Sequence, residues 1–217
     1  MYKSLDVEEV VMMELISAGR LALADALGTL TDEQWRGASM CAGWTPAHVL
    51  AHLTMPFRIP GEEFMAGLQR HGGDFTAYSD EIAERDSALP PAELVAVLLD
   101  NAENPWSPPG GGLTGALSHD LIHGLDMTWP IPVHYPIAGK AMITVLDSVT
   151  SKGAETIFGI SLAGVRVTAI DLGWSAGDGA PLHGASRDLL LLLAGRQVPA
   201  ERFEGEGARL AGVADAR

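Results

Sequence analysis

The stretch TPAHVLAH, residues 45–52, decides how the first half of the chain folds. Thr45 is a residue type that caps free backbone amides at a helix start, and Pro46 at the first helical position has no amide to leave unpaired. A helix is therefore predicted from Pro46 to the end of this stretch. Beyond it, Pro56 and Pro60 are predicted to kink or interrupt the helix, because proline lacks the amide that an interior helical residue donates.

Helical patterns extend to either side of this stretch. Apolar residues at the spacing of one helical face predict helices over residues 7–27, from Pro91 to near Asn104, and over residues 113–127. In the first of these, Arg20 is predicted to lie on the polar face. Thr31 followed by Gln34 has capping-box spacing and predicts a short helical turn, whereas residues 71–88 are interpreted as a polar connection. Four helices joined by loops indicate an antiparallel bundle.

The pattern changes in the second half of the chain. Three prolines mark the predicted domain boundary: Pro130, Pro132 and Pro136. Beyond them, a helix is predicted over residues 138–151, and two β-branched runs within residues 155–177 are predicted to pair as a hairpin joined at Ala163 and Gly164. A leucine-rich helix is predicted over residues 186–194. The predicted fold class is therefore α+β.

Composition excludes several classes of function. The 217 residues include 14 basic and 28 acidic side chains, a formal net charge of −14, which repels nucleic-acid phosphates and anionic membrane surfaces. The longest apolar run, Leu189–Ala194, is too short to span a bilayer, and no secretory signal is visible. A single cysteine, Cys41, cannot form an internal disulfide, which fits a reducing compartment. We expect a cytoplasmic protein that binds neither nucleic acid nor membrane.

Histidine spacing carries the functional information. His48 and His52 lie four residues apart in HVLAH, and His119 and His123 do so in HDLIH, so each pair shares one face of a predicted helix. Seven histidines scattered at random would give only about 0.2 such pairs, so two pairs are difficult to attribute to chance. One pair alone would be weak evidence for a metal site. Two pairs on separate helices predict a metal site, and the alternative is ordinary surface or core histidines.

Two aspartates belong to this hypothesis. Asp120 and Asp126 lie beside the second pair, where a carboxylate would fix the tautomer of a ligating imidazole. Asp126 could equally be an exposed residue at a helix end. Cys41 is interpreted as a small structural residue, because a lone cysteine is more often packed than nucleophilic. His48 has two interpretations: a spare ligand or acid/base that faces the same cavity, or an exposed or merely packed residue.

The string SMCAGWTPAHVLAHL, residues 39–53, resembles a signature of the DinB-like superfamily, in particular its actinobacterial branch related to mycothiol-dependent maleylpyruvate isomerase. HDLIHGLDM, residues 119–127, resembles the second signature of that superfamily. The resemblance implies that residues 1–130 form a four-helix bundle that carries a divalent metal. Matched position by position, the implied ligands are His52, His119 and His123. The isomerase itself has a glutamate at the position of His119, so this chain follows the three-histidine pattern of the wider superfamily.

The resemblance continues past the prolines. Residues 166–196 are similar to the sterol-carrier-like C-terminal domain that is often fused to these bundles, which implies an α+β domain over residues 136–217. Together the two parts cover nearly the whole chain. The bundle motifs are typical of the superfamily and select no particular substrate, because one fold and one metal site serve several reactions.

Three neutral imidazoles on Zn²⁺ would leave an open coordination position, as in catalytic zinc sites. The resemblance implies that a low-molecular-weight thiol, mycothiol, binds there and attacks a small electrophile, which gives S-transfer or isomerisation. Zinc is the expected metal, with nickel as the alternative. A metal-dependent hydrolase and a non-catalytic, metal-braced ligand-binding protein remain open, and so does a homodimer. No catalytic residue beyond the ligands is assigned.

Overall fold

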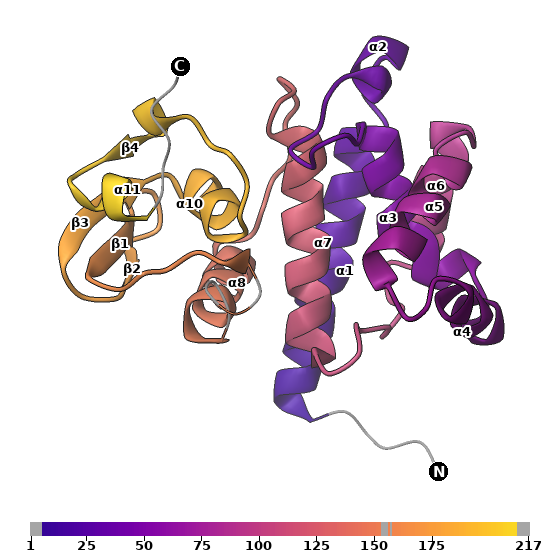
Figure 1. Ribbon diagram of the computed structural model, residues 1–217, viewed down its shortest axis with the longest axis horizontal. Helices are drawn as coiled ribbons and strands as arrows, with labels where there is room; N and C mark the ends of the chain where they lie inside the picture. Colours follow the sequence, from indigo (N-terminus) through magenta and orange to yellow (C-terminus); the bar gives the residue numbers. More distant parts are fainter. Residues whose placement is uncertain (1–5, 153–155, 157, 212–217) are drawn as a thin grey trace. The chain divides into compact units, whose positions relative to one another are not determined.

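The computed structural model describes residues 6–152, 156 and 158–211. The chain divides into two compact units, Met1–Pro136 and Ile137–Arg217 (Figure 1). The first unit is helical, and the second combines helices with a small mixed sheet. The fold class is α+β, as the sequence predicts. None of the helices in the described part of the chain is both long and apolar enough to span a bilayer.

Seven helices are described in the first unit: α1 Val7–Leu27, α2 Asp32–Arg36, α3 Pro46–Arg58, α4 Gly61–Arg70, α5 Phe75–Asp86, α6 Pro91–Asp100 and α7 Gly112–Thr128. Helix α1 packs against α6 and α7, and α3 packs against α5, α6 and α7 (Figure 1). Fully buried leucines fill the space between them: Leu23, Leu27, Leu50, Leu53, Leu94, Leu98 and Leu125. This packing is what places α3 beside α7.

Capping explains where the first helices begin. The Asp6 side chain accepts a hydrogen bond from the Glu9 amide at 2.9 Å, and the Glu9 carboxylate accepts one from the Asp6 amide at 3.0 Å. The same reciprocal pair joins Thr31 and Gln34 at the start of α2. Each box satisfies amides that have no partner within the helix. The predicted start and end of α1 and the predicted capping box of α2 are confirmed.

Of the two effects predicted for Pro56, a kink or an interruption, the interruption is wrong, because α3 continues through it to Arg58. Proline removes one amide donor, and the side chain of Arg58 supplies hydrogen bonds in the same turn. Its Nη2 donates to the Ala51 carbonyl at 2.7 Å, and its Nε donates to Thr54 Oγ1 at 3.2 Å. These bonds hold the last turn of α3 together, although neither of them reaches the His52 carbonyl, to which an amide at position 56 would have donated. Pro60 does separate two helices, because α3 ends at Arg58 before it and α4 begins directly after it.

The polar connection predicted over residues 71–88 contains helix α5. Asp74 caps this helix by accepting a hydrogen bond from the Ala77 amide at 3.0 Å. Its apolar face is narrow, with Tyr78 and Ile82 buried one turn apart against Met55 of α3 and Ile59 beyond its end. The spacing of four between Tyr78 and Ile82 fits a helix, but the charged residues around them leave too few apolar positions to show a helical pattern in the sequence.

The second unit contains α8 Gly139–Lys152, β1 Val165–Ala169, β2 Trp174–Ala176, β3 Ala180–Gly184, α10 Ser186–Leu193, a 3-10 turn at Ala200–Arg202, β4 Phe203–Glu204 and α11 Gly207–Leu210. The strand order is β2-β1-β3-β4. Strand β1 runs antiparallel to β2 and parallel to β3, and β4 runs antiparallel to β3. Helices α8 and α10 contact each other and the strands. The two predicted helices, residues 138–151 and 186–194, are confirmed as α8 and α10.

The predicted hairpin is misplaced. Residue 157 of its first run lies outside the described residues, and residues 158–164 contain no strand. Gly164 instead has φ 72° in a turn that leads into β1, where the Val165 amide donates to the Leu162 carbonyl at 3.0 Å. The hairpin observed joins β1 to β2, with Val167 opposite Ala176. A β-branched run without an alternating buried face does not distinguish a loop from a strand.

An ion-pair cluster links the end of α3 to the end of α5. Asp86 is buried and accepts hydrogen bonds from Arg58 and from Arg85, whose Nε lies 2.6 Å from Asp86 Oδ1. Burial raises the pKa of the Asp86 carboxyl, but the hydrogen bonds from Arg85 and Arg58 outweigh it and hold that pKa below its usual value. A carboxyl whose pKa is lowered by folding stabilises the native state above its unfolded pKa, and this stabilisation is lost as the pH falls through the folded pKa.

We therefore expect Asp86→Asn to lower the free energy of unfolding at pH 7 by about 3 kcal/mol, because it breaks a buried ion pair on one side. The deficit should shrink as the pH falls through the folded pKa of Asp86, since the wild type loses the same interaction there. Urea unfolding between pH 7 and pH 3 measures both effects. Asp80→Asn, an exposed change on the same helix, is the control. A deficit that stays constant with pH would contradict the prediction.

Candidate metal centre

The three predicted ligand histidines lie together in the structure. His52 comes from α3, and His119 and His123 come from α7, with one nitrogen of each ring within 4.8 Å of the others. The Nε2 atoms of His52 and His119 are 3.3 Å apart. Because α3 packs against α7, the i,i+4 pair of α7 faces a single histidine of α3. His52 is 7% exposed, and the other two rings are partly exposed.

A polar side chain engages the Nδ1 atom of each ring. His52 Nδ1 lies 2.8 Å from Ser79 Oγ, His119 Nδ1 lies 3.2 Å from Asp120 Oδ1, and His123 Nδ1 lies 2.9 Å from Asp126 Oδ2. A carboxylate accepts and cannot donate, so the two aspartates favour the tautomer with hydrogen on Nδ1. Nε2 is then the atom with which each ring would coordinate a metal.

Burial also sets the protonation state of His52. Desolvation, and secondarily the neighbouring rings of His123 and His119, lower the pKa of His52 to about 2, although Asp126 opposes them. His52 is therefore neutral at pH 7, the state that a metal ligand requires. If His52 and His119 both carry hydrogen on Nδ1, two Nε2 lone pairs face each other across 3.3 Å. A divalent cation between the rings would remove the repulsion between these lone pairs, and three imidazoles are ligands that such a metal takes. An Nε2 hydrogen on one of the two rings would instead make this contact a hydrogen bond.

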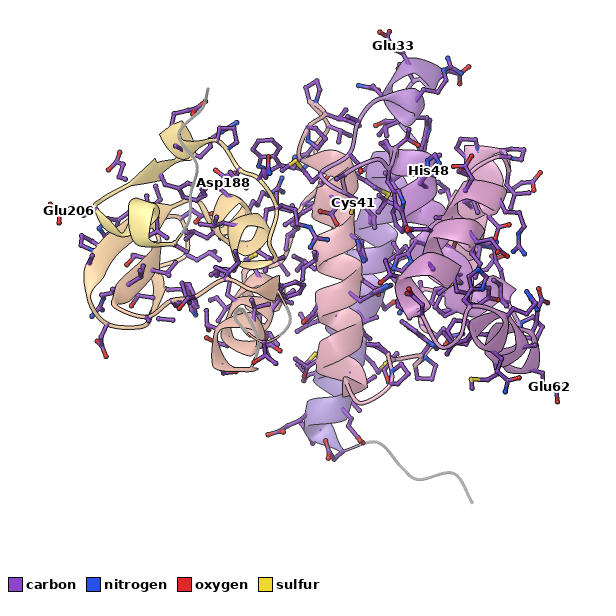
Figure 2. The ribbon with its side chains drawn as sticks, in the orientation of Figure 1. Glu33, Cys41, His48, Glu62, Asp188 and Glu206 are labelled. Atoms are coloured by element: carbon purple, nitrogen blue, oxygen red, sulfur yellow. The ribbon has the colours of Figure 1, made fainter. Side chains whose placement is uncertain are left out.

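Asp126 is fully buried, which excludes the exposed helix-end interpretation. Its Oδ2 accepts from Cys41 Sγ at 3.1 Å as well as from His123, and its carbonyl accepts from the Met40 amide at 2.9 Å. The loop before α3 is thereby tied to α7. Cys41, which is labelled in Figure 2, is half-buried. Cys41, His123 and Asp126 form a second group whose ligand atoms lie within 4.8 Å of one another.

His48 does not join the cluster. It occupies the third position of α3, and its Nδ1 lies 2.7 Å from Thr45 Oγ1 at the start of that helix. Its Nε2 lies 3.0 Å from the Glu84 carboxylate of α5, on the α5 side of α3 (Figure 2). Of its two interpretations, the structure supports the packed residue. The two histidines of α3 therefore differ in role: His48 contacts the cap residue Thr45, and His52 belongs to the histidine cluster.

Aromatic rings surround the histidines. The Trp44 and Phe75 rings lie 5.4 Å and 6.4 Å from the His52 ring, and the Trp106 ring lies 5.5 Å from the His119 ring. Phe75 is 48% exposed, so this aromatic surface reaches solvent. Apolar walls of this kind reduce the access of water to a centre and strengthen electrostatic interactions within it.

Sequence reasoning missed three residues of this centre. Ser79 lies on α5, whose helical period was not recognised, and Trp106 follows α6 in a proline-rich loop. The sequence predicts Arg20 on the polar face of α1, yet its side chain is 0% exposed and donates to Asp120 at 2.6 Å. The Tyr78 and Ile82 spacing could have revealed α5. For Arg20 no sequence signal existed, because an arginine in an amphipathic helix is normally solvated.

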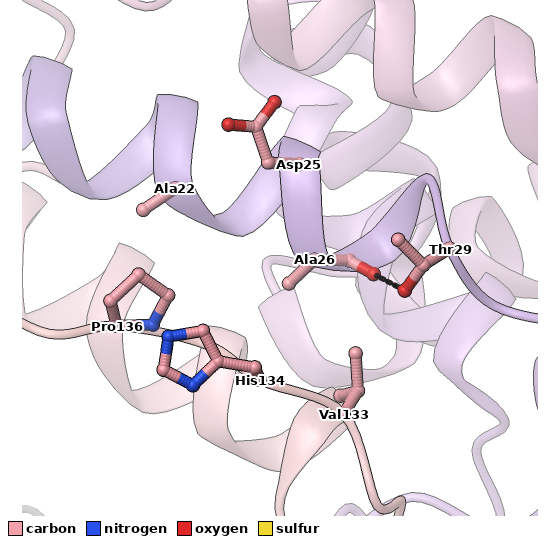
Figure 3. Close-up of a pocket in the computed structure, with 7 residues that line it drawn as sticks. All are labelled: Ala22, Asp25, Ala26, Thr29, Val133, His134 and Pro136. Atoms are coloured by element: carbon pink, nitrogen blue, oxygen red, sulfur yellow. Dashed lines mark hydrogen bonds between the residues drawn. The ribbon is translucent and has the colours of Figure 1, made fainter.

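A cavity of about 490 Å³ lies elsewhere in the first unit (Figure 3). It is lined from α1 by Ala22, Asp25, Ala26 and Thr29, and from the segment after α7 by Val133, His134 and Pro136. None of these residues belongs to the histidine cluster. The candidate centre is therefore defined by its side chains and not by this cavity.

Residues 16–104 match the family described as the mycothiol maleylpyruvate isomerase N-terminal domain. Two solved structures share the fold: mycothiol-dependent maleylpyruvate isomerase, at 16% identity and a TM-score of 0.58, and its histidine-to-alanine mutant, at 15% and 0.57. Each alignment covers 93% of this chain and 93% of the other. No curated protein matches the sequence significantly. The predicted resemblance to this family is therefore confirmed over residues 16–104.

Proposed function

We propose that this protein is a divalent-metal-dependent enzyme that uses a low-molecular-weight thiol, mycothiol, for S-transfer to a small electrophile or for its isomerisation. The observation that carries the proposal is the cluster of three imidazoles from two helices, with Nε2 atoms of two rings 3.3 Å apart and each Nδ1 engaged by a polar side chain. The family match and the shared fold support the choice of thiol.

His52, His119 and His123 would hold the metal, with zinc expected and nickel as the alternative. A bound divalent cation favours the thiolate over the thiol form of a ligand at neutral pH and has room for a small ligand beside three imidazoles. The three-histidine set differs from the glutamate-containing set that the resemblance gives to the isomerase at the position of His119. We therefore propose the reaction class and no particular electrophile.

The chain's own side chains would orient the ligands and shield them from water. Asp120 and Asp126 accept hydrogen bonds from their histidines and hold each ring in one tautomer. Ser79 can accept the Nδ1 hydrogen of His52 in the same way. Trp44 and Trp106 pack against the rings and limit the water around a reactive thiolate.

The same resemblance supports two proposals about architecture. We propose that α1, α3, α6 and α7 are the DinB-like four-helix bundle of a domain over residues 1–130, since they pack against one another. Residues 136–217 are proposed as a sterol-carrier-like domain, on the basis of their mixed sheet and packed helices.

The cytoplasm is proposed as the compartment, because the sequence has one cysteine.

The first prediction concerns metal content. Untagged wild-type protein should contain about one zinc per chain, and His52→Ala should lose most of it, because two imidazoles bind zinc far more weakly than three. Elemental analysis after dialysis measures the ratio. His48→Ala, one turn earlier on the same helix, is the matched control and should keep its zinc. Full zinc in His119→Ala would remove that residue from the site, and no zinc in the wild type, even after titration, would contradict the enzyme proposal.

The second prediction concerns the thiol. Zinc-loaded protein should turn over small electrophiles only when mycothiol is present, with loss of thiol in S-transfer and no net loss in isomerisation. Thiol titration and chromatography of the products follow the two outcomes, and His52→Ala is the inactive control. Turnover that is independent of thiol would instead indicate a metal-dependent hydrolase.

The third prediction concerns Ser79. Ser79→Ala should weaken zinc binding by about tenfold, because His52 loses the partner that orients its ring. Competition with a chromophoric chelator measures the affinity. Ser87→Ala, a change at the end of the same helix, should leave it unchanged. An unaltered zinc affinity in Ser79→Ala would show that packing alone orients His52.

A further inference from the structure

A buried arginine lies behind the histidine cluster. Arg20 is in the middle of α1, and its side chain is 0% exposed. Removing a guanidinium from water is unfavourable, and an apolar side chain of similar size would often stabilise such a core equally well or better. Its Nη2 is a buried nitrogen that has no hydrogen-bond partner among the residues described. Stability alone therefore does not explain an arginine at this position.

One side of the guanidinium holds the partner of His119. Arg20 Nε donates to Asp120 Oδ2 at 2.6 Å, and the other oxygen of that carboxylate, Oδ1, lies 3.2 Å from His119 Nδ1. The carboxylate therefore divides its two oxygens between the arginine and the histidine. Asp120 is itself buried, so Arg20 supplies the charge that compensates it.

The other side of the guanidinium holds the loop that follows α6. Arg20 Nη1 donates to the carbonyls of Asn101 and Asn104, each at 2.8 Å. Asn104 Oδ1 then accepts from the Trp106 amide at 3.0 Å. The Trp106 ring packs 5.5 Å from the His119 ring, so this chain of contacts also ends at that histidine.

An aromatic contact closes the arrangement. The Phe57 ring of α3 lies 5.1 Å from the guanidinium carbon of Arg20 and 6.3 Å from the Trp106 ring. Arg20 therefore contacts three segments that pack beside α1: helix α7, the loop after α6, and helix α3. A planar group with five donors can hold several partners in one geometry, which a lysine cannot.

We infer that Arg20 is a positioning residue for the metal centre, which holds His119 from two directions: through Asp120 on its Nδ1 edge and through Asn104 and Trp106 on its ring. The inference rests on the proposed metal-binding function of the three histidines. It adds a residue of α1, a helix that carries neither histidine motif, to the residues that determine metal affinity.

Cobalt titration tests this role without any substrate. Co²⁺ replaces zinc in such sites, and its visible absorption bands depend on the number and geometry of the ligands. Arg20→Met should weaken Co²⁺ binding by about 10- to 100-fold, the usual effect of losing a group that orients a ligand, and should alter the bands. Arg58→Met is the matched control, because it breaks a partly buried arginine–aspartate pair in which the aspartate, Asp86, is not one of the residues that contact the clustered rings in the bonds described above. It should lower the melting temperature and leave the Co²⁺ spectrum unchanged.

A double-mutant cycle separates positioning from general packing. If Arg20 acts through Asp120, the variant Arg20→Met/Asp120→Leu should lose less Co²⁺ affinity than the product of the two single losses. Arg20→Lys keeps the charge and cannot reach all three acceptors, so it should show an intermediate loss. This variant decides the question if Arg20→Met does not fold.

Three results would overturn the inference. A folded Arg20→Met or Arg20→Lys protein with wild-type affinity and wild-type bands excludes a positioning role. Losses that multiply in the double variant exclude action through Asp120. Failure of the wild-type protein to bind Co²⁺ or zinc would overturn the proposed function together with this inference, whereas normal wild-type binding with an unaffected Arg20 variant would overturn this inference alone.

Discussion

The packing of α3 against α7 is the contact on which the candidate centre depends. It brings one histidine from a capped, proline-started helix to the face of another helix that carries two histidines one turn apart. Sequence separation between the two motifs is more than sixty residues, so neither motif can assemble a site alone. Buried leucines between the helices hold this approach, and the ligand geometry follows from core packing more than from any flexible loop.

Near the contact between α3 and α7, three buried polar side chains each pair with one histidine of the cluster. Ser79, Asp120 and Asp126 come from two helices, and each meets an Nδ1 atom. Buried polar groups are unfavourable without partners, so a network in which each member orients a ligand fits selection for a defined centre. Cys41 and Arg20 extend the network outward by one step through the two carboxylates. The acidic surface charge of the chain is separate from this interior network.

The family match and the shared fold constrain the chemistry without completing it. The two solved structures, at 15–16% identity over nearly the whole chain, share its fold, and the family match is a likeness of residues 16–104. Substrate choice depends on side chains that differ between such distant relatives. In this chain, His119 and the aromatic rings that pack against the cluster are among the side chains at the candidate centre. The thiol and the electrophile are therefore matters for direct measurement.

The sequence by itself determined the helices with strong caps and wide apolar faces, the α+β class, and the three histidines, because periodicity and i,i+4 spacing are local properties. It did not predict α5, whose buried apolar residues Tyr78, Ile82 and Ala83 stand among charged ones, or the end of α3, which continues past Pro56 to Arg58. Arg20 looked like a solvated residue until the tertiary structure buried it beside Asp120. Which polar residues meet inside a core depends on contacts between distant segments, and only the tertiary structure decides those.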